Sequence, residues 1–411
     1  MKKKYNTKIR HIVLVIALFF VGLQSYATPS SNGIIGAGLL VQPMPQYELP
    51  DLFAEAFFSS QIDLSQSLLI RTEFSVFTDS IIGDNFLKDI PAYFSLNELS
   101  LTYVGSLGTI SQLASVFIGE TDPIGSDLFL RRLFGLPSFT SRILETSQSL
   151  SSAQLYPMSG LGVSYTLKAT DNFATALYFY YNKLNIASSI PGDDDNTSLN
   201  IDARFAGAWP WLIFDLSAGL TLPFEKYDAD DEEVILLIRK ADFHAGLSLF
   251  VGSSYTSSFL LQAGLIKLVF SPNPNLNEEI IALKDITLLV EPRFKTKNLG
   301  IAFSLFNIPP QVAQKLFYIE NPLGVNVSLF YNTFANLGFQ GEIGVHTTFS
   351  APESTFALSQ DDLAIQIAPY IKADIGGGSL NAAIKCKILD FTSFDGAIES
   401  TSLSIGYKAQ L

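Results

Sequence analysis

The stretch that decides the fold is Ser400–Leu411, STSLSIGYKAQL, at the C-terminal end of the sequence. Polar and apolar side chains alternate along it. Because successive side chains of a β-strand point to opposite faces, this segment has one apolar face and one polar face. A soluble tail is usually polar and frayed, whereas this segment keeps its alternation as far as Leu411. The pattern predicts a regular, two-faced strand.

Segments with the same alternation recur along the chain, from Ile34–Gln42 to Thr401–Leu411, and about eighteen can be read. Their connections alternate between short turns and longer loops, which is the rhythm of a transmembrane barrel. An even number of strands places both termini on the same side of such a barrel. The sequence therefore predicts an all-β fold, a transmembrane antiparallel up-and-down β-barrel of about 18 strands, with 16 as the smaller alternative.

The composition agrees with this fold class. The chain is 48% hydrophobic, yet after Leu23 it has no run of about 18 apolar residues, which excludes a helical membrane protein. Only 16% of the residues are charged, and aromatic residues are mostly Phe and Tyr. Cys386 is the only cysteine, so no internal disulfide forms. A barrel in lipid is favoured over the alternative of a soluble β-sandwich.

Residues 1–27 have the pattern of a secretory signal peptide. Basic residues precede an apolar run, Ile12–Leu23, that is too short to span a bilayer as a helix. Ser25-Tyr26-Ala27 has the form of a cleavage site, and the alternative is an uncleaved anchor. Cleavage leaves residues 28–411 as the barrel domain and moves the net charge from −13 to −18, because the signal holds five basic and no acidic residues. So acidic an exported chain argues against a nucleic-acid partner.

The C-terminal segment resembles the terminal strand of bacterial outer-membrane barrels, which ends in an alternating apolar row and an aromatic last residue. Leu411 stands in the place of that aromatic residue. The resemblance covers the architecture and this strand. It implies the outer membrane of a diderm bacterium as the location, with outer-membrane lipid, the barrel-assembly machinery and small solutes as partners.

The longest connection, Thr121–Pro157, is too apolar to be fully exposed to solvent, since Leu128–Gly135 is rich in Leu and Phe. It is also third in the count of long loops. The third long loop of many porins folds inward and narrows the pore, so this resemblance in position implies that loop 121–157 folds into the lumen. The candidate pore-constriction residues are then Arg131, Arg132 and Asp127. The alternative is that the arginines hold the loop together by pairing with Asp122, Asp127 or Glu145.

The polar faces of the strands are predicted to line the lumen, and their charges are mixed. Pairing between neighbouring strands is the expected arrangement, and rings of one sign would tune selectivity. The basic residues of the last three strands have no inward acid between them and form a strip that attracts anions. The candidate pore-lining residues are Arg71, Glu73, Glu98, Asp202, Arg204, Lys240, Asp242, Glu291, Arg293, Lys372, Lys385, Lys387 and Lys408.

The leading hypothesis for function is an outer-membrane, porin-like channel for passive diffusion of small polar solutes or ions. One alternative is an outer-membrane transporter for hydrophobic compounds. In that case Thr28–Pro50 forms an N-terminal plug, Ile34–Gln42 is not a strand, and inward aromatic residues such as Tyr178 and Phe306 line a greasy path. A second alternative is a structural or adhesive surface barrel whose lumen is closed by loops.

Catalytic and metal-binding patterns are not found in the sequence. His244 and His346 fall on polar faces, but neither has a Ser or Asp partner at a recognisable spacing. Cys and His residues do not cluster at metal-ligand spacing. We therefore predict no enzyme activity, no metal and no cofactor. Acidic runs at Asp193–Asp195 and Asp228–Glu233 are interpreted as solvated loop tips, or alternatively as divalent-cation contacts at the outer surface.

Overall fold

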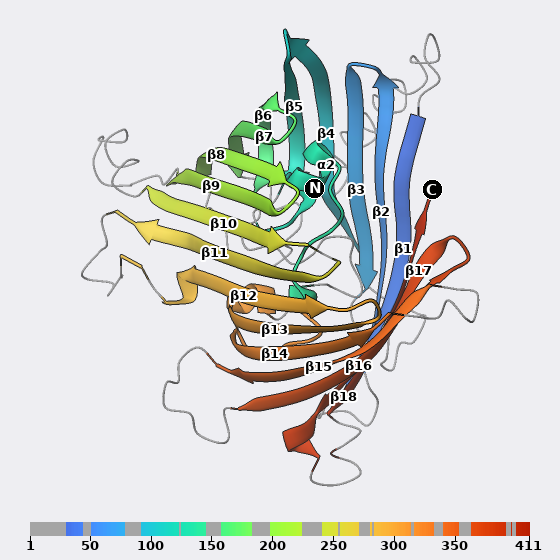
Figure 1. Ribbon diagram of the computed structural model, residues 1–411. Coiled ribbons are helices and arrows are strands. Elements are labelled where there is room, and N and C mark those ends of the chain that lie inside the picture. Colours follow the sequence, from blue (N-terminus) through green and yellow to red (C-terminus); the bar gives the residue numbers. More distant parts are fainter. Residues whose placement is uncertain are drawn as a thin grey trace, which may run out of the picture.

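The protein is an 18-stranded antiparallel sheet that closes on itself (Figure 1). A computed structural model describes residues 30–43, 51–78, 92–122, 125–144, 158–182, 198–223, 241–253, 255–270, 280–281, 283–313, 316–332, 340–352, 363–391, 396 and 400–411. Each strand pairs with its two neighbours in the sequence, and the first strand pairs with the last. The predicted fold class and strand number are confirmed.

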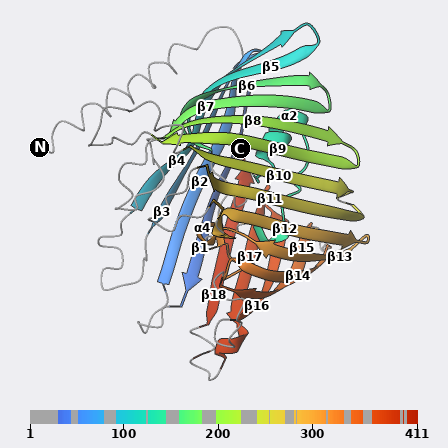
Figure 2. The ribbon, with the colours of Figure 1, turned by 90° about the vertical axis from the view of Figure 1, so that its left-hand side faces the viewer.

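The strands are between nine and sixteen residues long. Their order around the barrel follows the chain, as the continuous change of colour in Figures 1 and 2 shows. The strands are β1 Ser30–Gln42, β2 Asp51–Ser65, β3 Leu68–Thr78, β4 Ala92–Leu107, β5 Ile110–Glu120, β6 Ser159–Thr170, β7 Phe173–Asn182, β8 Ser198–Trp209, β9 Leu212–Pro223, β10 Asp242–Gly252, β11 Ser257–Val269, β12 Ile286–Lys295, β13 Leu299–Asn307, β14 Leu323–Tyr331, β15 Gly341–Ala351, β16 Ala364–Ile375, β17 Gly378–Lys387 and β18 Thr401–Gln410.

The seam between β1 and β18 closes the barrel. Ile34 pairs with Gln410 and Val41 with Leu403, while the other edge of β1 pairs with β2 along its whole length. The seam ends with the Leu411 N–H donating to the Gly33 carbonyl at 2.8 Å. Residues 34–42 are therefore a wall strand, and the alternative in which they form a plug is wrong. Closure leaves no unpaired edge, which a strand in lipid could not tolerate.

The two faces of each strand meet different surroundings. On β18 the polar Ser402 and Ser404 are buried toward the interior, whereas Ile405 and Tyr407 are exposed on the outside. The outer surface of the barrel is apolar on most strands, as the exposed Leu, Ile, Val and Phe side chains show. Polar side chains inside and apolar side chains outside are the reverse of the distribution in a soluble protein. A barrel surrounded by lipid requires this distribution.

The connections alternate in length along most of the chain, and the connection from Tyr331 of β14 to Gly341 of β15 is an exception, because it is long where the alternation predicts a short turn. The turn between β16 and β17 is one of the short ones, with Gly376 at φ +62° and Gly377 at φ +81°, values that favour glycine. The short turns share one end of the barrel with the first residue of β1 and the last residue of β18.

Three groups of predictions fall outside the described residues. They are the signal peptide at 1–27, the acidic runs at 193–195 and 228–233, and the individual residues Lys240 and Glu145. None of the helices in the described part of the chain is long and apolar enough to cross a membrane.

Candidate functional site: a loop that crosses the lumen

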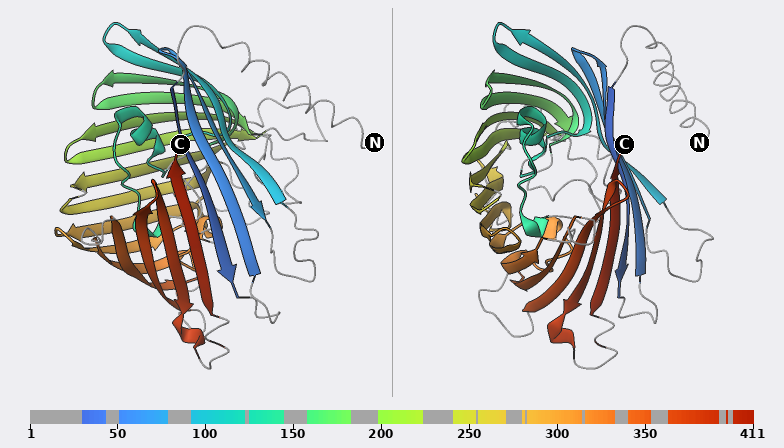
Figure 3. Two further views of the ribbon diagram at one scale, coloured as in Figure 1. Left: turned by 90° about the vertical axis from the view of Figure 1, so that its right-hand side faces the viewer. Right: turned by 45° about the vertical axis from the view of Figure 1, so that its right-hand side comes forward.

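The connection between β5 and β6 is described at residues 121–122, 125–144 and 158, and the remainder of loop 121–157 lies outside the described residues. Its described part lies inside the ring of strands, where Figure 3 shows α2, Leu128–Phe134, and the segment after it. Phe129 and Leu130 of α2 are buried, and they join an apolar cluster with the wall residues Phe117 and Tyr180. The helix ends at Gly135, whose φ of +67° closes it with a bond from its N–H to the Arg131 carbonyl. The cost of placing this loop in a polar lumen is thus offset by its apolar contacts.

The first anchor of the loop joins Arg132 to two carboxylates. Its guanidinium contacts Glu98 of β4 at 2.6 Å and Asp122, just after β5, at 3.1 Å. Tyr178 of β7 donates to the second oxygen of Asp122 at 3.1 Å. All these groups are largely buried, so each ion pair replaces hydration that the charges have lost.

The charge on Asp122 is held by its surroundings. Burial would raise the pKa of this carboxyl, but Arg132 and Arg204 outweigh that effect and lower the pKa of Asp122 below its ordinary value. Arg204 of β8 also donates to the Asp122 carbonyl and pairs with Asp215 of β9, with Nε 2.7 Å from Oδ1. Its guanidinium lies 4.3 Å from the centre of the Phe129 ring on α2.

The middle of the loop is held by backbone contacts. Gln262 of β11 donates to the Gly125 carbonyl at 2.8 Å, and Arg293 of β12 donates to the Thr140 carbonyl at 2.7 Å. Within the loop, the Phe139 N–H donates to the Asp127 carboxylate at 3.0 Å. The Phe139 ring packs against Phe250 of β10, with the centroids 5.7 Å apart. The loop path is thus fixed against β10, β11 and β12.

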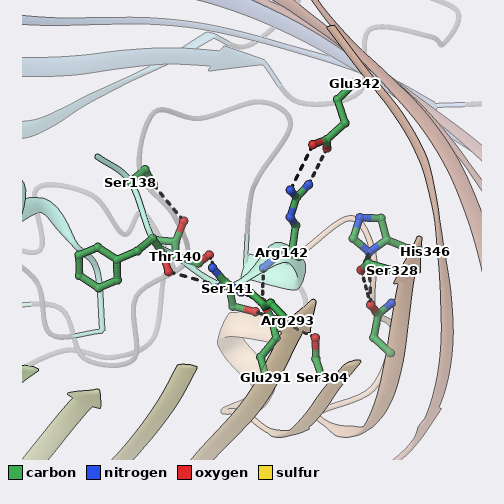
Figure 4. Close-up of polar contacts among 12 residues, drawn as sticks. Ser138, Thr140, Ser141, Arg142, Glu291, Arg293, Ser304, Ser328, Glu342 and His346 are labelled. Atoms are coloured by element: carbon green, nitrogen blue, oxygen red, sulfur yellow. Dashed lines mark hydrogen bonds and ion pairs between the residues drawn. The ribbon is translucent and has the colours of Figure 1, made fainter. Parts of the chain in front are cut away.

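The next part of the loop is hydrogen-bonded to Glu291 of β12 (Figure 4). Its carboxylate is fully buried and accepts hydrogen bonds from Ser141 of the loop, from Arg293 at 2.7 Å and from Ser304 of β13 at 2.7 Å. A buried carboxylate with this many donors is satisfied without solvent, so it acts as a fixed anchor for the loop backbone.

The last anchor is Arg142, in the short 3-10 helix Arg142–Leu144. Its guanidinium meets both carboxylate oxygens of Glu342 on β15, as Figure 4 shows. It also lies 3.8 Å from the centre of the Phe330 ring of β14. Arg142 also donates to the Tyr370 hydroxyl of β16 at 3.3 Å. From Glu98 to Tyr370, the described part of the loop is therefore tied to the wall from β4 round to β16.

A second connection, between β13 and β14, also lies inside the barrel, and it was not predicted from the sequence. It includes α4, Pro310–Ala313, and its base is closed by the Ile308 N–H donating to the Pro322 carbonyl at 2.9 Å. Leu316 and Ile319 are buried in the same apolar cluster as α2. The Tyr318 ring stacks on His346 of β15 at 4.0 Å, and Thr348 donates to the Tyr318 carbonyl at 2.8 Å. This connection covers β15 and its neighbours.

Glu320 attaches the second connection to β16 and β17. Its carboxylate pairs with Lys387, accepts a hydrogen bond from Gln366 at 2.6 Å and lies 4.0 Å from Lys385. Lys385 also lies 5.5 Å from the centre of the Phe317 ring. The two lysines therefore face an acid that the strand pattern did not contain, because it comes from a loop.

A cavity of about 380 Å³ remains between α2 and the wall formed by β1 to β4. Its charged lining combines Arg71, Glu73 and Glu98 from the wall with Arg131 and Arg132 from the loop. Arg131 is the more exposed of the two arginines, at 42%, and its guanidinium lies 3.7 Å from the Asp127 carboxylate. The cavity thus has mixed charge, with cations contributed by both of its sides.

The predicted constriction residues lie at this cavity or next to it. Arg131 and Arg132 line it, and Asp127 is buried at the start of α2. The alternative in which the arginines pair with acids of the loop also describes their contacts, because Arg132 meets Asp122 and Arg131 meets Asp127. The two arginines therefore both line the cavity and pair with acids of the loop.

The predicted pore-lining residues that the structure describes lie on the inner face of the wall. They divide into two groups by their contacts. Those tied to a lumenal loop are Glu98, Arg204, Glu291, Arg293, Lys385 and Lys387. Those in contact with other residues of the wall are Arg71, Glu73, Asp202, Asp242, Lys372 and Lys408. Of the neighbours two apart in the sequence, Glu291 and Arg293 form an ion pair with each other, whereas Asp202 pairs with His244 and Arg204 with Asp215.

Two of the histidines make hydrogen bonds inside the wall. His244 pairs with Asp202, and His346 meets Ser328 at 2.8 Å and the Asn326 side-chain oxygen at 3.3 Å. Within the ranges that the structure describes, no three His, Cys, Asp or Glu side chains gather where a metal ion could be held.

No protein-family model matches the sequence, and no curated protein matches it. Solved structures are similar in shape. OccAB3 of Acinetobacter baumannii has a TM-score of 0.50 at 8% identity, covering 94% of this chain and 100% of that one. OmpF of Salmonella typhi, solved with daunomycin, has 0.42 at 10%, covering 93% and 97%. The porin of Rhodopseudomonas blastica, as a triple mutant, has 0.41 at 11%, covering 93% and 100%. At 8% identity the likeness to OccAB3 shows a shared fold, so the predicted porin-like barrel is confirmed as an architecture.

Proposed function

We propose that the protein is a porin-like channel of the bacterial outer membrane, through which small polar solutes or ions diffuse passively. The observation that carries the proposal is the combination of an apolar outer face, a closed barrel and a lumen crossed by an anchored loop beside a charged cavity. Such a lumen admits water and filters solutes by size and charge.

Loop 121–157 acts as the constriction in this proposal. Its ion pairs with Glu98 and Glu342 and its hydrogen bond to Glu291 hold it across the lumen, so solutes pass on the side of β1 to β4. Arg131, Arg132 and Asp127 then set the local charge at the narrowest part. The likeness in fold to OccAB3 supports a barrel that folds in lipid, with the assembly machinery as its expected partner.

The two alternatives have less support. A transporter for hydrophobic compounds would use Ile34–Gln42 as part of a plug, but those residues belong to strand β1. Tyr178 and Phe306 do face inward, yet both are buried beneath loops and do not line an open path. A purely structural barrel would need a lumen closed on all sides, whereas a cavity lies beside α2.

Planar bilayer recording tests the proposal. The purified, folded protein is expected to give stepwise conductance, and the same preparation boiled in detergent is the control. Proteoliposomes should swell in small sugars and not in large oligosaccharides. Absence of both signals from a protein that shows heat-modifiable gel migration would contradict a channel and favour the structural barrel.

Export by a cleaved signal peptide is part of the same proposal. We expect the mature protein to begin at Thr28 and to fractionate with outer membranes. Intact mass spectrometry of protein extracted from that fraction checks the cleavage. A mass that still includes residues 1–27 would support the uncleaved anchor instead.

A further inference from the structure

Lys385 and Lys387 form a pair of cations on the inner face of β17. They are two residues apart, so both side chains point into the lumen. Lys385 is mostly buried and Lys387 is one-third exposed. Two positive charges on the wall of a water-filled pore attract anions and repel cations, unless a negative charge is placed against them.

Glu320 supplies that negative charge from a loop. It pairs with Lys387, lies 4.0 Å from Lys385 and is oriented by Gln366, which donates to it at 2.6 Å. The backbone next to it is fixed independently, because Tyr318 stacks on His346 and its carbonyl accepts a hydrogen bond from Thr348. The carboxylate is therefore held over the lysines by packing as well as by charge.

We infer that Glu320 is a selectivity-determining residue of the channel, because it offsets one of the two positive charges of the lysine pair of β17 and so weakens a preference for anions. The inference rests on the proposed channel function. A loop residue has this effect only while the loop is docked, so the ionic preference of the pore depends on how the second connection packs against β15 to β17.

The expected size of the effect follows from Coulomb's law. For a unit charge roughly 7 Å from a permeating ion, in water at 0.1 M salt, this law gives a change in the anion-to-cation permeability ratio of roughly twofold to threefold. At 1 M salt the Debye length falls to about 3 Å, and the change should shrink into the error of the measurement.

Reversal potentials in a KCl gradient test the inference. Glu320→Gln should raise the ratio of chloride to potassium permeability, and Lys387→Gln should lower it. The double variant Glu320→Gln with Lys387→Gln should return close to the unmodified channel, because the pair is removed together. Asp390→Asn is the matched control: it makes the same change in net charge at an exposed position just after β17.

The outcomes separate cleanly. If the unmodified protein conducts and Glu320→Gln leaves the ratio unchanged, the role of Glu320 is wrong while the channel stands. A shift as large in Asp390→Asn, or a shift that persists in the double variant, also overturns the inference, because either would show an effect unrelated to the pair. If the unmodified protein does not conduct, the proposed function itself fails. Heat-modifiable migration confirms that each variant is folded.

Discussion

Arg142 and Glu342 are 200 residues apart in the sequence and meet inside the barrel through two parallel contacts, Nη1 to Oε1 at 2.5 Å and Nη2 to Oε2 at 3.1 Å. Tyr370 of β16 donates to the same carboxylate at 2.7 Å. This fork-to-fork pair fastens the far end of the lumenal loop to the side of the barrel opposite its origin on β5. The docking of this part of the loop therefore rests on an interaction that can be removed with one substitution.

Glu342→Gln should loosen that end of the loop. The substitution leaves Arg142 without its carboxylate at a site where both side chains are more than four-fifths buried, which costs about 1–3 kcal/mol of docking free energy. We expect larger and noisier single-channel conductance, with the barrel still folded. Arg142→Lys is the control, since it keeps the positive charge but loses the two-pronged contact with Glu342 and the guanidinium contact with the Phe330 ring. Its conductance should lie between that of the unmodified channel and that of Glu342→Gln. Unchanged conductance in Glu342→Gln would show that this pair does not position the loop.

The neighbouring arginines of α2 should differ in their effects. Arg132→Gln breaks two ion pairs that are largely buried, so it should release the start of the loop and raise conductance. Arg131→Gln removes a half-exposed charge with one weak contact, so it should alter ion selectivity at low salt and leave conductance in 1 M salt nearly unchanged. Recording both variants at 0.1 M and 1 M KCl distinguishes them. Equal effects would contradict the division between anchor and lining residue.

Asp122 makes the docking of the loop against the wall sensitive to acid pH. Because its folded-state pKa is lowered below the ordinary value of about 3.9, its stabilising contribution is fully present above that value and is lost as pH falls through the lowered pKa. We expect the docking that depends on Asp122 to be constant from pH 7 to about 4 and to weaken only below that range. Asp122→Asn should show the weakened state at every pH. Bilayer conductance as a function of pH measures both, and a change in the unmodified channel near pH 6 that Asp122→Asn abolishes would contradict this assignment.

Two inward-facing glycines should respond differently to an added methyl group. At Gly219 a Cβ would lie 2.1 Å from the Asp202 carboxylate and 2.5 Å from His244, so Gly219→Ala should disrupt that pair. At Gly264 the nearest atoms are 3.5 Å away, so Gly264→Ala should be neutral or slightly stabilising. The temperature at which the folded gel band is lost compares the two. We expect it to fall for Gly219→Ala only, and a fall of equal size in Gly264→Ala would show that strand flexibility decides the result.

The wall of the barrel was predictable from the sequence because each strand carries its own signal. Alternation with period two identifies both faces of β18, and the even strand number follows from the lengths of the connections. At β1 the glycine-rich sequence weakened that signal, so strand and plug both remained open. Only the pairing of Ile34 with Gln410 decides between them.

The lumenal contacts were not predictable in the same way. An ion pair such as Arg142 with Glu342 joins a loop to a distant strand, and no local pattern specifies the partner. The second connection did carry a signal, because Leu316–Ile319 is as apolar as the segment around α2 and would be costly to expose. Missing it made the lysines of β17 look unopposed, although Glu320 lies directly beside this apolar segment.

The seam between β1 and β18 has a consequence for how the molecule is made. Its pairs join residues near opposite ends of the chain, so the contact of highest sequence separation is also the one that completes the sheet. Until β18 has paired, the other seventeen strands form at most an open sheet with two exposed edges. Such edges can pair with the edges of other chains. Contacts this remote in sequence form slowly. Folding should accordingly wait for the last strand, and weakening Leu403–Tyr407 should lower the yield of folded barrel more than its permeability.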